Sequence, residues 1–280
     1  MAEAFLTRRE KFSAAHHYAV RRFTPDEAKR IYGVTSVHGH NYVLETTIRG
    51  PVSERTGMVE NLKKLKDVMR RHALAGLHNR FLNEDVERFE EEPPTLENIS
   101  DYLWDKMLPF FPGGRLHRVR LFEEETLYVD RVQGRSDVFL TRVYEFCASH
   151  RLHEPGLSAG ENRAIFGKCN NPNGHGHNYI VEVTVKGAVD ERTGVIGNLD
   201  EMDRLVNDEV IEYLDHHHLN TDVPEFGDLN PTAENIARVI WDRLDVNPGG
   251  AKLHRIRLYE TARNIADYYG PSGEDSPGTQ

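Results

Sequence analysis

The hydrophobic pattern of the chain predicts short strands separated by two amphipathic helices. Residues 143–152 and 177–187 alternate in polarity, which is typical of strands whose side chains point to opposite faces in turn. Between residues 198 and 214 the apolar side chains recur every three or four positions, which indicates a helix. A Pro-Thr start signal predicts a second helix over 231–244. Two further strands are predicted at 253–261 and 264–270.

The same pattern occurs twice. VHGHNYVLETTIRG at 37–50 matches GHGHNYIVEVTVKG at 174–187, and PTLENISDYLWD at 94–105 matches PTAENIARVIWD at 231–242, each pair at an offset of 137 residues. The strand that precedes them repeats at an offset of 134, so the second copy has about three additional residues before its His-Gly-His. A repeat of this length indicates a duplicated domain, because solenoid units span only ~20–50 residues.

We therefore predict two tandem units, residues 1–135 and 136–270, that meet in the polar stretch QGRSD. Each unit is expected to have an α+β fold of order ββααββ, with both helices on one face of an antiparallel sheet. Residues 271–280 are rich in Gly, Ser, Pro and acidic side chains, and we expect this tail to be disordered.

The composition and charge of the chain argue against several classes of protein. A net charge of −10 argues against nucleic acid as a partner, because nucleic-acid binders usually carry a basic excess. No apolar run approaches the ~20 residues that a membrane helix needs, and the N-terminus lacks the apolar segment of a secretory signal. With only two cysteines in the chain, the expected location is the reducing cytoplasm.

A set of histidines predicts a metal site in the second copy. His175 and His177 are two residues apart on a strand, so both imidazoles point to one face. His150 on the preceding strand can lie opposite them. Three histidine ligands leave a fourth position open, which is typical of catalytic zinc. The first copy repeats the set as His16, His38 and His40.

Candidate proton-transfer groups lie nearby in the second copy. Cys169 is six residues before His175 in a polar loop, where a thiolate near a dication has a lowered pKa and can act as a base. Cys147 lies on the strand face away from His150 and is interpreted as a packing residue. Asp215 and His216 form either a carboxylate–imidazole relay or a polar helix end.

Three further side chains are candidates for substrate binding. Glu260 ends an alternating strand and shares a face with Leu258, so it either points into an apolar site or is an edge-strand acid. Thr232 and Glu234 fit either a pocket wall or a helix N-cap pattern.

The motifs FCASHRL, GKCNNPNGHGHNY, LDHHHLN, NPTAEN and LYET, in this order, resemble the 6-pyruvoyl-tetrahydropterin synthase family over most of residues 140–270. The first copy resembles the family in outline over residues 5–130. The resemblance implies the tunnelling fold, in which ββααββ units assemble around a barrel, and active sites at subunit interfaces. It also implies a lyase that removes triphosphate from 7,8-dihydroneopterin triphosphate to give 6-pyruvoyl-tetrahydropterin.

By this resemblance, His150, His175 and His177 would hold zinc. Cys169 would be the base, and Asp215 and His216 would complete the proton relay with it. The pterin ring would be anchored by Glu260 in a pocket lined by Thr232 and Glu234.

The first copy departs from the family pattern. It has no cysteine. Tyr32 lies as far before the His-Gly-His of the first copy as Cys169 lies before that of the second. His78 and Asn79 replace Asp215 and His216. We expect a scaffold half that can bind metal and pterin without catalysis, with Thr95, Glu97 and Glu123 as its possible pterin residues.

Three alternatives stay open at this point. One is the related 6-carboxytetrahydropterin synthase of queuosine biosynthesis, although the spacing from Cys169 to His175 favours the pyruvoyl type. The others are a non-catalytic pterin-binding protein and a zinc hydrolase that would not need the thiol. The tandem arrangement suggests a homo-oligomer, a trimer of this chain holding the six units of a hexamer.

Overall fold

A computed structural model of the chain describes residues 2–245 and 247–273. The chain forms two compact units. The first is Met1–Thr141 together with Lys186–Asn198, and the second is Arg142–Val185 together with Leu199–Gln280. One segment of the second sequence copy therefore belongs to the first unit. Residues 274–280 of the tail predicted to be disordered lie outside the described residues.

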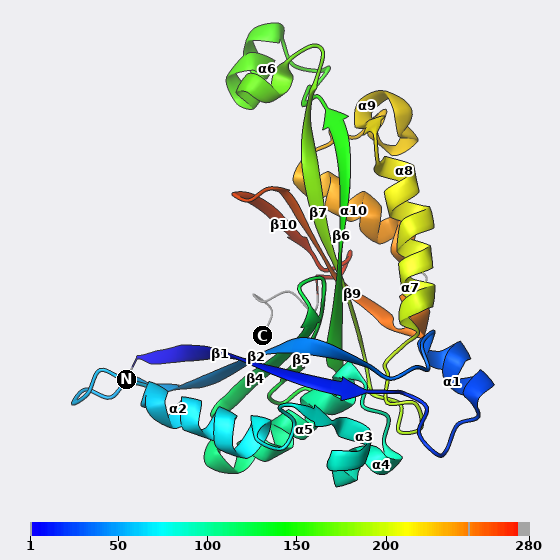
Figure 1. The fold of residues 1–280 in the computed structure, drawn as a ribbon. Helices are drawn as coiled ribbons and strands as arrows, with labels where there is room; N and C mark the ends of the chain where they lie inside the picture. The colour runs from blue at the N-terminus through cyan, green and yellow to red at the C-terminus, as the bar shows by residue number, and fades with distance from the viewer. Residues whose placement is uncertain (1, 246, 274–280) are drawn as a thin grey trace. The chain divides into compact units, whose positions relative to one another are not determined.

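The first unit has a largely antiparallel sheet with the strand order β3-β1-β2-β4-β5. Figure 1 labels β1, β2, β4 and β5. β1 and β2 pair along their whole length, which places His16 directly opposite His38. β4 pairs antiparallel with β2 and β5, whereas the short β3 runs parallel to β1. The strands are β1 (Glu3–His16), β2 (His38–Pro51), β3 (Arg80–Phe81), β4 (Leu116–Glu124) and β5 (Leu127–Val132).

The helices of the first unit follow from amphipathic sequence. The second long helix, α5, packs on β4 and β5 and buries Ile99, Leu103 and Met107. The first, α2, continues into a π-helical turn, η1, that packs against α5. The helical elements are α1 (Pro25–Tyr32), α2 (Leu62–Val68), η1 (Met69–Leu74), α3 (Leu82–Asp85), α4 (Glu87–Glu91), α5 (Leu96–Met107) and η2 (Leu108–Phe110).

The second unit repeats this plan with the strand order β10-β9-β7-β6, and β8 pairs parallel with β6. Helix α10 packs on β9 and β10 (Figure 1). Its strands are β6 (Val138–His150, which begins in the first unit), β7 (His175–Gly187), β8 (His217–His218), β9 (Lys252–Thr261) and β10 (Asn264–Tyr268). Its helical elements are α6 (Ala159–Phe166), η3 (Gly167–Asn170), α7 (Leu199–Val206), η4 (Asn207–Ile211), α8 (Glu212–Leu214), α9 (Leu219–Asp222), η5 (Pro224–Phe226), α10 (Ala233–Leu244) and η6 (Pro248–Gly250).

The predicted α+β fold of two tandem ββααββ units is confirmed, with one addition. A short helix, α1 or α6, lies between the first two strands of each copy, where a loop was expected. Both helices begin with a capping box, Thr24 with Glu27 and Ser158 with Glu161. That signal was present in the sequence, because Ser or Thr followed three positions later by Glu marks a helix start.

The interior of each unit repeats one aromatic pair beneath the histidines. Phe12 stacks on Tyr42 with ring centroids 4.9 Å apart, and Phe146 stacks on Tyr179 at the same distance. All four rings are buried. Because each pair joins the first strand of a copy to the second, it holds the strand ends that carry the histidines in register.

The single α-helices α5 and α10 have 12 residues each, and α7, η4 and α8 form one continuous helical run over 199–214, whereas a membrane span needs ~20 apolar residues. Throughout the described residues, no helix meets the length and apolarity that a membrane span requires.

Candidate metal centres and active site

His150, His175 and His177 converge in the second unit, as the sequence predicted. His150 ends β6 and the other two begin β7, and their ligand nitrogens lie within 4.8 Å of one another. The Nδ1 of His150 lies 2.8 Å from the carbonyl oxygen of Pro231, so this nitrogen carries the proton and Nε2 keeps a free lone pair. Buried nitrogens without a hydrogen-bond partner face this point: His150 Nε2, His175 Nδ1 and His177 Nε2.

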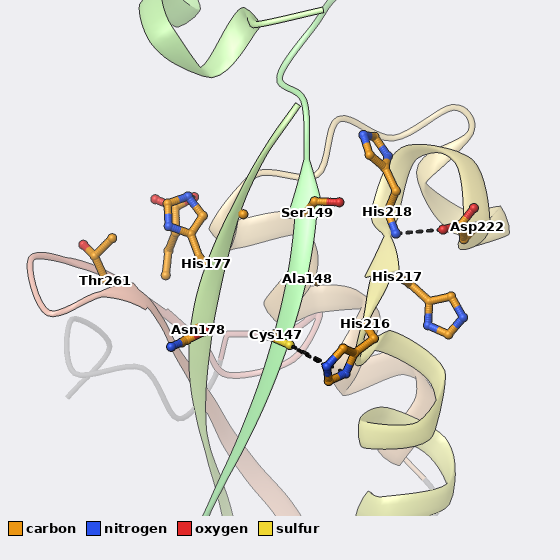
Figure 2. A pocket seen from close by; sticks show the side chains of 12 residues that line it. Cys147, Ala148, Ser149, His177, Asn178, His216, His217, His218, Asp222 and Thr261 are labelled. Atoms are coloured by element: carbon orange, nitrogen blue, oxygen red, sulfur yellow. Dashed lines mark hydrogen bonds and ion pairs between the residues drawn. The ribbon is translucent and has the colours of Figure 1, made fainter. Parts of the chain in front are cut away.

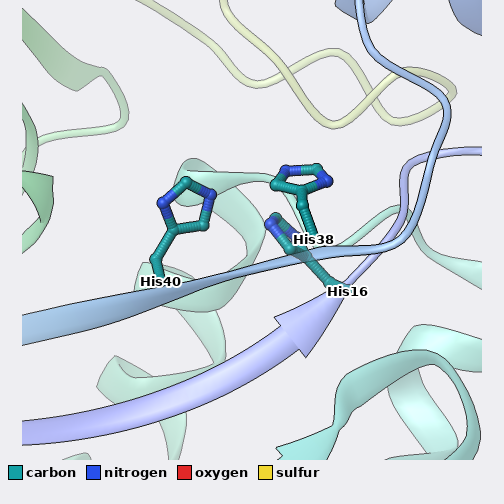
Figure 3. A group of neighbouring side chains, drawn as sticks. All are labelled: His16, His38 and His40. Carbon is teal, nitrogen blue, oxygen red and sulfur yellow. The ribbon is translucent and has the colours of Figure 1, made fainter.

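The first unit builds the same cluster from His16, His38 and His40 (Figure 3). The Nδ1 of His16 lies 2.8 Å from the carbonyl oxygen of Pro94, which repeats the orienting contact of His150. In both copies a glycine separates the paired histidines. A Cβ on Gly39 would lie only 2.9 Å from the carbonyl oxygen of Ala14, so the two strands approach closely here.

Burial favours the neutral form of four of the six imidazoles. It lowers the pKa of His150 and His175 in the second unit and of His40 in the first, and it lowers the pKa of His16 to about 3. A buried, neutral imidazole with an unpaired nitrogen is costly unless that nitrogen binds something. In the second unit each of the three histidines has one buried nitrogen without a hydrogen-bond partner, and this set fits a divalent ion with a preference for imidazole, as zinc has.

A carboxylate lies beside each cluster. The Oε1 of Glu260 is 3.6 Å from His150 Nε2 and 3.9 Å from His177 Nε2. In the first unit the Oε1 of Glu123 is 3.7 Å from His40 Nε2. Glu260 therefore points into the site, as one of its two sequence interpretations required, rather than standing on an outer strand edge.

Asp215 and His216 form a hydrogen-bonded pair, with Asp215 Oδ2 2.7 Å from His216 Nδ1. Asp215 Oδ1 also accepts a hydrogen bond from the Cys147 backbone N–H at 2.7 Å, which holds the pair against β6. This backbone hydrogen bond is the main cause that lowers the pKa of the Asp215 carboxyl, so the carboxylate stays charged beside the imidazole. The relay arrangement is therefore present in the geometry.

The thiol beside this pair is Cys147, not Cys169. The Cys147 Sγ lies 3.5 Å from a ring nitrogen of His216, and Figure 2 shows the imidazole directed toward β6. Cys147 does lie on the face away from His150, but it lines an open pocket rather than a packed core. Among the described residues, no hydrogen bond or ion pair joins Cys169 to Asp215 or His216. The predicted grouping of Cys169 with Asp215 and His216 is therefore not seen within one chain, and it stays a prediction.

Cys169 lies in η3, where its carbonyl oxygen accepts a hydrogen bond from the Leu152 N–H at 2.9 Å. Burial, followed by the negative charge of Glu260, raises the pKa of its thiol. The proposed match of Tyr32 to Cys169 is wrong. Tyr32 and Phe166 each end a capped helix before a glycine of positive φ, so these two residues correspond. Cys169 instead belongs to the longer loop of the second copy.

The pocket of the second unit is an open groove of about 830 Å³. It joins the neighbourhood of the histidine cluster, on β7, to the relay pair beyond β6 (Figure 2). Its lining was only partly expected from sequence, because the contributions of β8 and α9 come from a loop without hydrophobic periodicity. The groove is lined by Cys147, Ala148, Ser149, Gly176, His177, Asn178, His216, His217, His218, Asp222, Glu260 and Thr261.

The helix-start residues differ between the copies. Thr232 caps α10 by accepting from the Asn235 N–H, which is the N-cap interpretation, and Glu234 is exposed. Thr95 caps α5 in the same way, but Thr95 and Glu97 are only 2% and 3% exposed. Of the three first-copy residues expected to line a pterin pocket, only Glu123 faces the histidine cluster, because the other two are covered by polypeptide.

Comparison with known proteins places the chain in a family. A family model described as 6-pyruvoyl tetrahydropterin synthase matches it twice, over residues 5–133 and 139–271. The chain belongs to the 6-pyruvoyl tetrahydropterin synthase family. Both copies are thus members of this family, and the two histidine clusters occupy the same place in each.

Individual relatives each span about one copy. The 6-pyruvoyl tetrahydrobiopterin synthase of Homo sapiens is 47% identical over 137 residues, which is 49% of this chain and 94% of the relative. That of Poecilia reticulata is 46% identical over 132 residues, 47% of this chain and 90% of the relative. Among solved structures, the Caenorhabditis elegans 6-pyruvoyl tetrahydropterin synthase is 38% identical, covering 48% of this chain and 96% of its own, with a TM-score of 0.46.

Proposed function

We propose that the second copy is a zinc-dependent lyase of tetrahydrobiopterin biosynthesis that removes triphosphate from 7,8-dihydroneopterin triphosphate and forms 6-pyruvoyl-tetrahydropterin. The observation that carries this is a three-histidine cluster with an adjacent carboxylate, connected to an Asp-His relay by a groove that His177, Glu260 and His216 line. Family membership supplies the substrate class, since the relatives named above are 6-pyruvoyl tetrahydropterin and tetrahydrobiopterin synthases.

The histidines would hold the ion, and bound zinc supplies Lewis acidity that makes the hydroxyl-bearing side chain of the substrate more acidic. Glu260 would accept hydrogen bonds from the amide and amino N–H groups of the pterin ring, because its carboxylate is aimed at the cluster. Its position beside His150 and His177 would set the distance between the ring and the reacting side chain. Substrate roles for Thr232 and Glu234 stay predictions.

Cys169 would act as the base and His216 as the group that passes the proton on, oriented by Asp215. Within one chain these groups do not meet, so we infer that Cys169 meets the pair of another copy of the chain. Cys147 holds the relay pair in place through its backbone. The first copy, which lacks both the thiol and the pair, would be the scaffold half.

Purified, zinc-loaded protein should release triphosphate from 7,8-dihydroneopterin triphosphate, and mass spectrometry should detect the 6-pyruvoyl product. A Cys169→Ser variant, which keeps a polar side chain of similar size, is the matched control and should lose the activity. Absence of triphosphate release would defeat the proposal. Formation of a 6-carboxy product with a two-carbon aldehyde would assign the chain to the carboxy branch instead.

A further inference from the structure

A sulfur, a carboxylate and an imidazole meet on the face of β6 that points away from the histidine cluster. The pairing of β8 with β6, which sets His217 opposite Ala148, brings them together. The ligand atoms of Cys147, Asp215 and His216 all lie within 4.8 Å of one another. The Cys147 Sγ is 3.6 Å from His216 Nδ1, and Asp215 Oδ2 is 2.7 Å from the same nitrogen. Figure 2 shows the thiol and the imidazole directed toward each other.

The first unit builds the same backbone framework from other side chains, Ser13, His78 and Asn79. The Ser13 N–H donates to His78 Nδ1 at 3.2 Å, and the Asn79 N–H donates to the Ser13 carbonyl oxygen at 2.7 Å. The second bond recurs in the second unit, between the His216 N–H and the Cys147 carbonyl oxygen at 2.6 Å. Since a hydroxyl and an amide support this framework in the first unit, the fold alone does not account for the thiol and the imidazole in the second.

The three donors are a set that thiophilic cations prefer. Thiolate and imidazole are both ligands of zinc, and thiolate favours soft ions in particular. Zinc with bonds of about 2.3 Å to sulfur and about 2.1 Å to nitrogen, at a tetrahedral angle, holds those two ligand atoms about 3.6 Å apart. The Cys147 Sγ and the His216 Nδ1 already have this separation. The carboxylate of Asp215 supplies the third ligand on the same side of the imidazole.

The charges at this cluster favour a bound cation over a free thiolate nucleophile. A hydrogen bond to the Asp215 carboxylate is the largest cause that raises the pKa of the Cys147 thiol, so the thiol keeps its proton beside the carboxylate. A divalent ion takes the place of that proton, and the thiolate and the carboxylate then neutralise its two charges. The proton on His216 Nδ1 moves to Nε2, which faces the open groove.

The cluster is open to ions from solvent. Cys147 and His216 line the groove of about 830 Å³, and the His216 side chain is 80% exposed. An entering ion must displace the hydrogen bonds among the three side chains, whereas the histidine clusters offer buried nitrogens that have no such bonds. The ion therefore binds more weakly here than in the histidine clusters, fills the site only when it is in excess over them, and is removed by desalting.

We propose that Cys147, Asp215 and His216 form a further metal site, distinct from the histidine clusters, that takes a thiophilic divalent cation such as zinc in excess or cadmium. Binding at this site does not depend on catalysis. Its consequence rests on the proposed function, because the ion occupies the two atoms, His216 Nδ1 and Asp215 Oδ2, that orient the relay. Zinc in excess should then inhibit the reaction that the zinc of the histidine cluster supports.

The first test is a titration of zinc-loaded, desalted protein with cadmium, followed by the ultraviolet absorption of the cadmium–thiolate bond. The histidine clusters contain no thiolate, so the signal reports a cysteine ligand. The wild type should gain a band that saturates at about one cadmium ion per chain and that excess zinc removes. Cys147→Ser should abolish the band. Cys169→Ser, which removes the other thiol of the chain, is the matched control and should keep it. His216→Asn should weaken cadmium binding by at least about 10-fold.

The second test is the rate of triphosphate release at rising concentrations of free zinc. The zinc concentration that halves the rate should be at least about 10-fold higher for Cys147→Ser than for the wild type, each compared with its own rate without added zinc.

The two tests fail separately. A cadmium band that persists in Cys147→Ser, or that Cys169→Ser abolishes, would overturn the proposed site, with circular dichroism confirming that each variant is folded. So would cadmium binding of equal strength in His216→Asn and the wild type. A chain that releases no triphosphate at all would defeat the proposed function, and the cadmium titration would still decide the site. A correct band without zinc inhibition would overturn the inhibitory consequence alone.

Discussion

The residue that separates the two copies most clearly is His216. It has a φ of 59°, in the left-handed region that few residues other than glycine adopt, and Asn79 has a φ of 57° at the matching place in the first copy. Asparagine tolerates this conformation better than histidine does. The second copy thus has a histidine in a backbone conformation that an asparagine would adopt at lower cost. Such backbone strain is expected of a functional residue that its surroundings hold in place.

His216→Asn should therefore separate activity from stability. We expect the rate of triphosphate release to fall roughly 100-fold or more, the usual contribution of a general acid–base group, while the thermal midpoint stays equal or rises. Steady-state kinetics and thermal unfolding of the same preparation measure both. The reverse variant, Asn79→His, is the matched control and should lower the midpoint without adding activity. A large loss of stability in His216→Asn would show that the imidazole is structural.

The histidine clusters should bind two metal ions per chain. Elemental analysis of protein loaded with zinc and desalted should give two ions for the wild type. Either His177→Ala or His40→Ala should reduce the content to one, since each removes a ligand from one cluster. If the wild type binds only one ion, only one cluster holds metal. The alanine variant that abolishes binding then identifies that cluster.

At the scale of secondary structure elements, the turn Asp190–Ile196, which covers the start of α5 and donates the Ile196 N–H to Glu97, has an electrostatic consequence. Burial raises the pKa of Glu97 to about 7, above the 4.5 of an exposed glutamate. Between these pH values the folded protein holds a proton that the unfolded chain has released. The free energy of unfolding should therefore fall as the pH rises from about 4.5 to 7, by at most about 3 kcal/mol.

Glu97→Gln should remove this dependence, because a neutral amide can still accept the Ile196 N–H. Urea unfolding at pH 5 and pH 8 should give a smaller difference between the two pH values for this variant than for the wild type. Glu90→Gln changes an exposed acid of α4 and should behave as the wild type does. Identical pH dependence in wild type and Glu97→Gln would contradict the assignment.

The elements also show how far sequence could predict the structure. The order ββααββ and both histidine clusters were predictable, because polarity patterns and His-x-His spacing are local signals. Helices α1 and α6 were missed although their capping boxes were present. The contact of Asp190–Ile196 with α5 and the contact of Cys147 with His216 could not be predicted, because each joins segments far apart in sequence and no local pattern indicates that they meet.

At the scale of the whole molecule, catalysis should require two chains. If Cys169 of one chain meets the Asp215–His216 pair of another, a Cys169→Ser chain and a His216→Asn chain should each be strongly impaired alone. Mixing them under conditions that exchange subunits should restore part of the wild-type rate, because some sites then receive both intact groups. A mixture of Cys169→Ser with Cys169→Ala chains is the control and should stay inactive. Lack of recovery in the first mixture, with exchange verified by mass, would place all three groups in one chain.

The turn Asp190–Ile196, which covers Thr95 and Glu97, makes the first copy depend on a segment of the second copy. A chain truncated after residue 135 would retain every strand and helix of the first copy, yet it would lose the cover of α5 and leave a buried acid open to water. Gly194 is encoded in the second copy, but its contact with α5 of the first copy decides which substitutions it tolerates. The first copy therefore depends on a segment of the second copy for the cover of its own helix start.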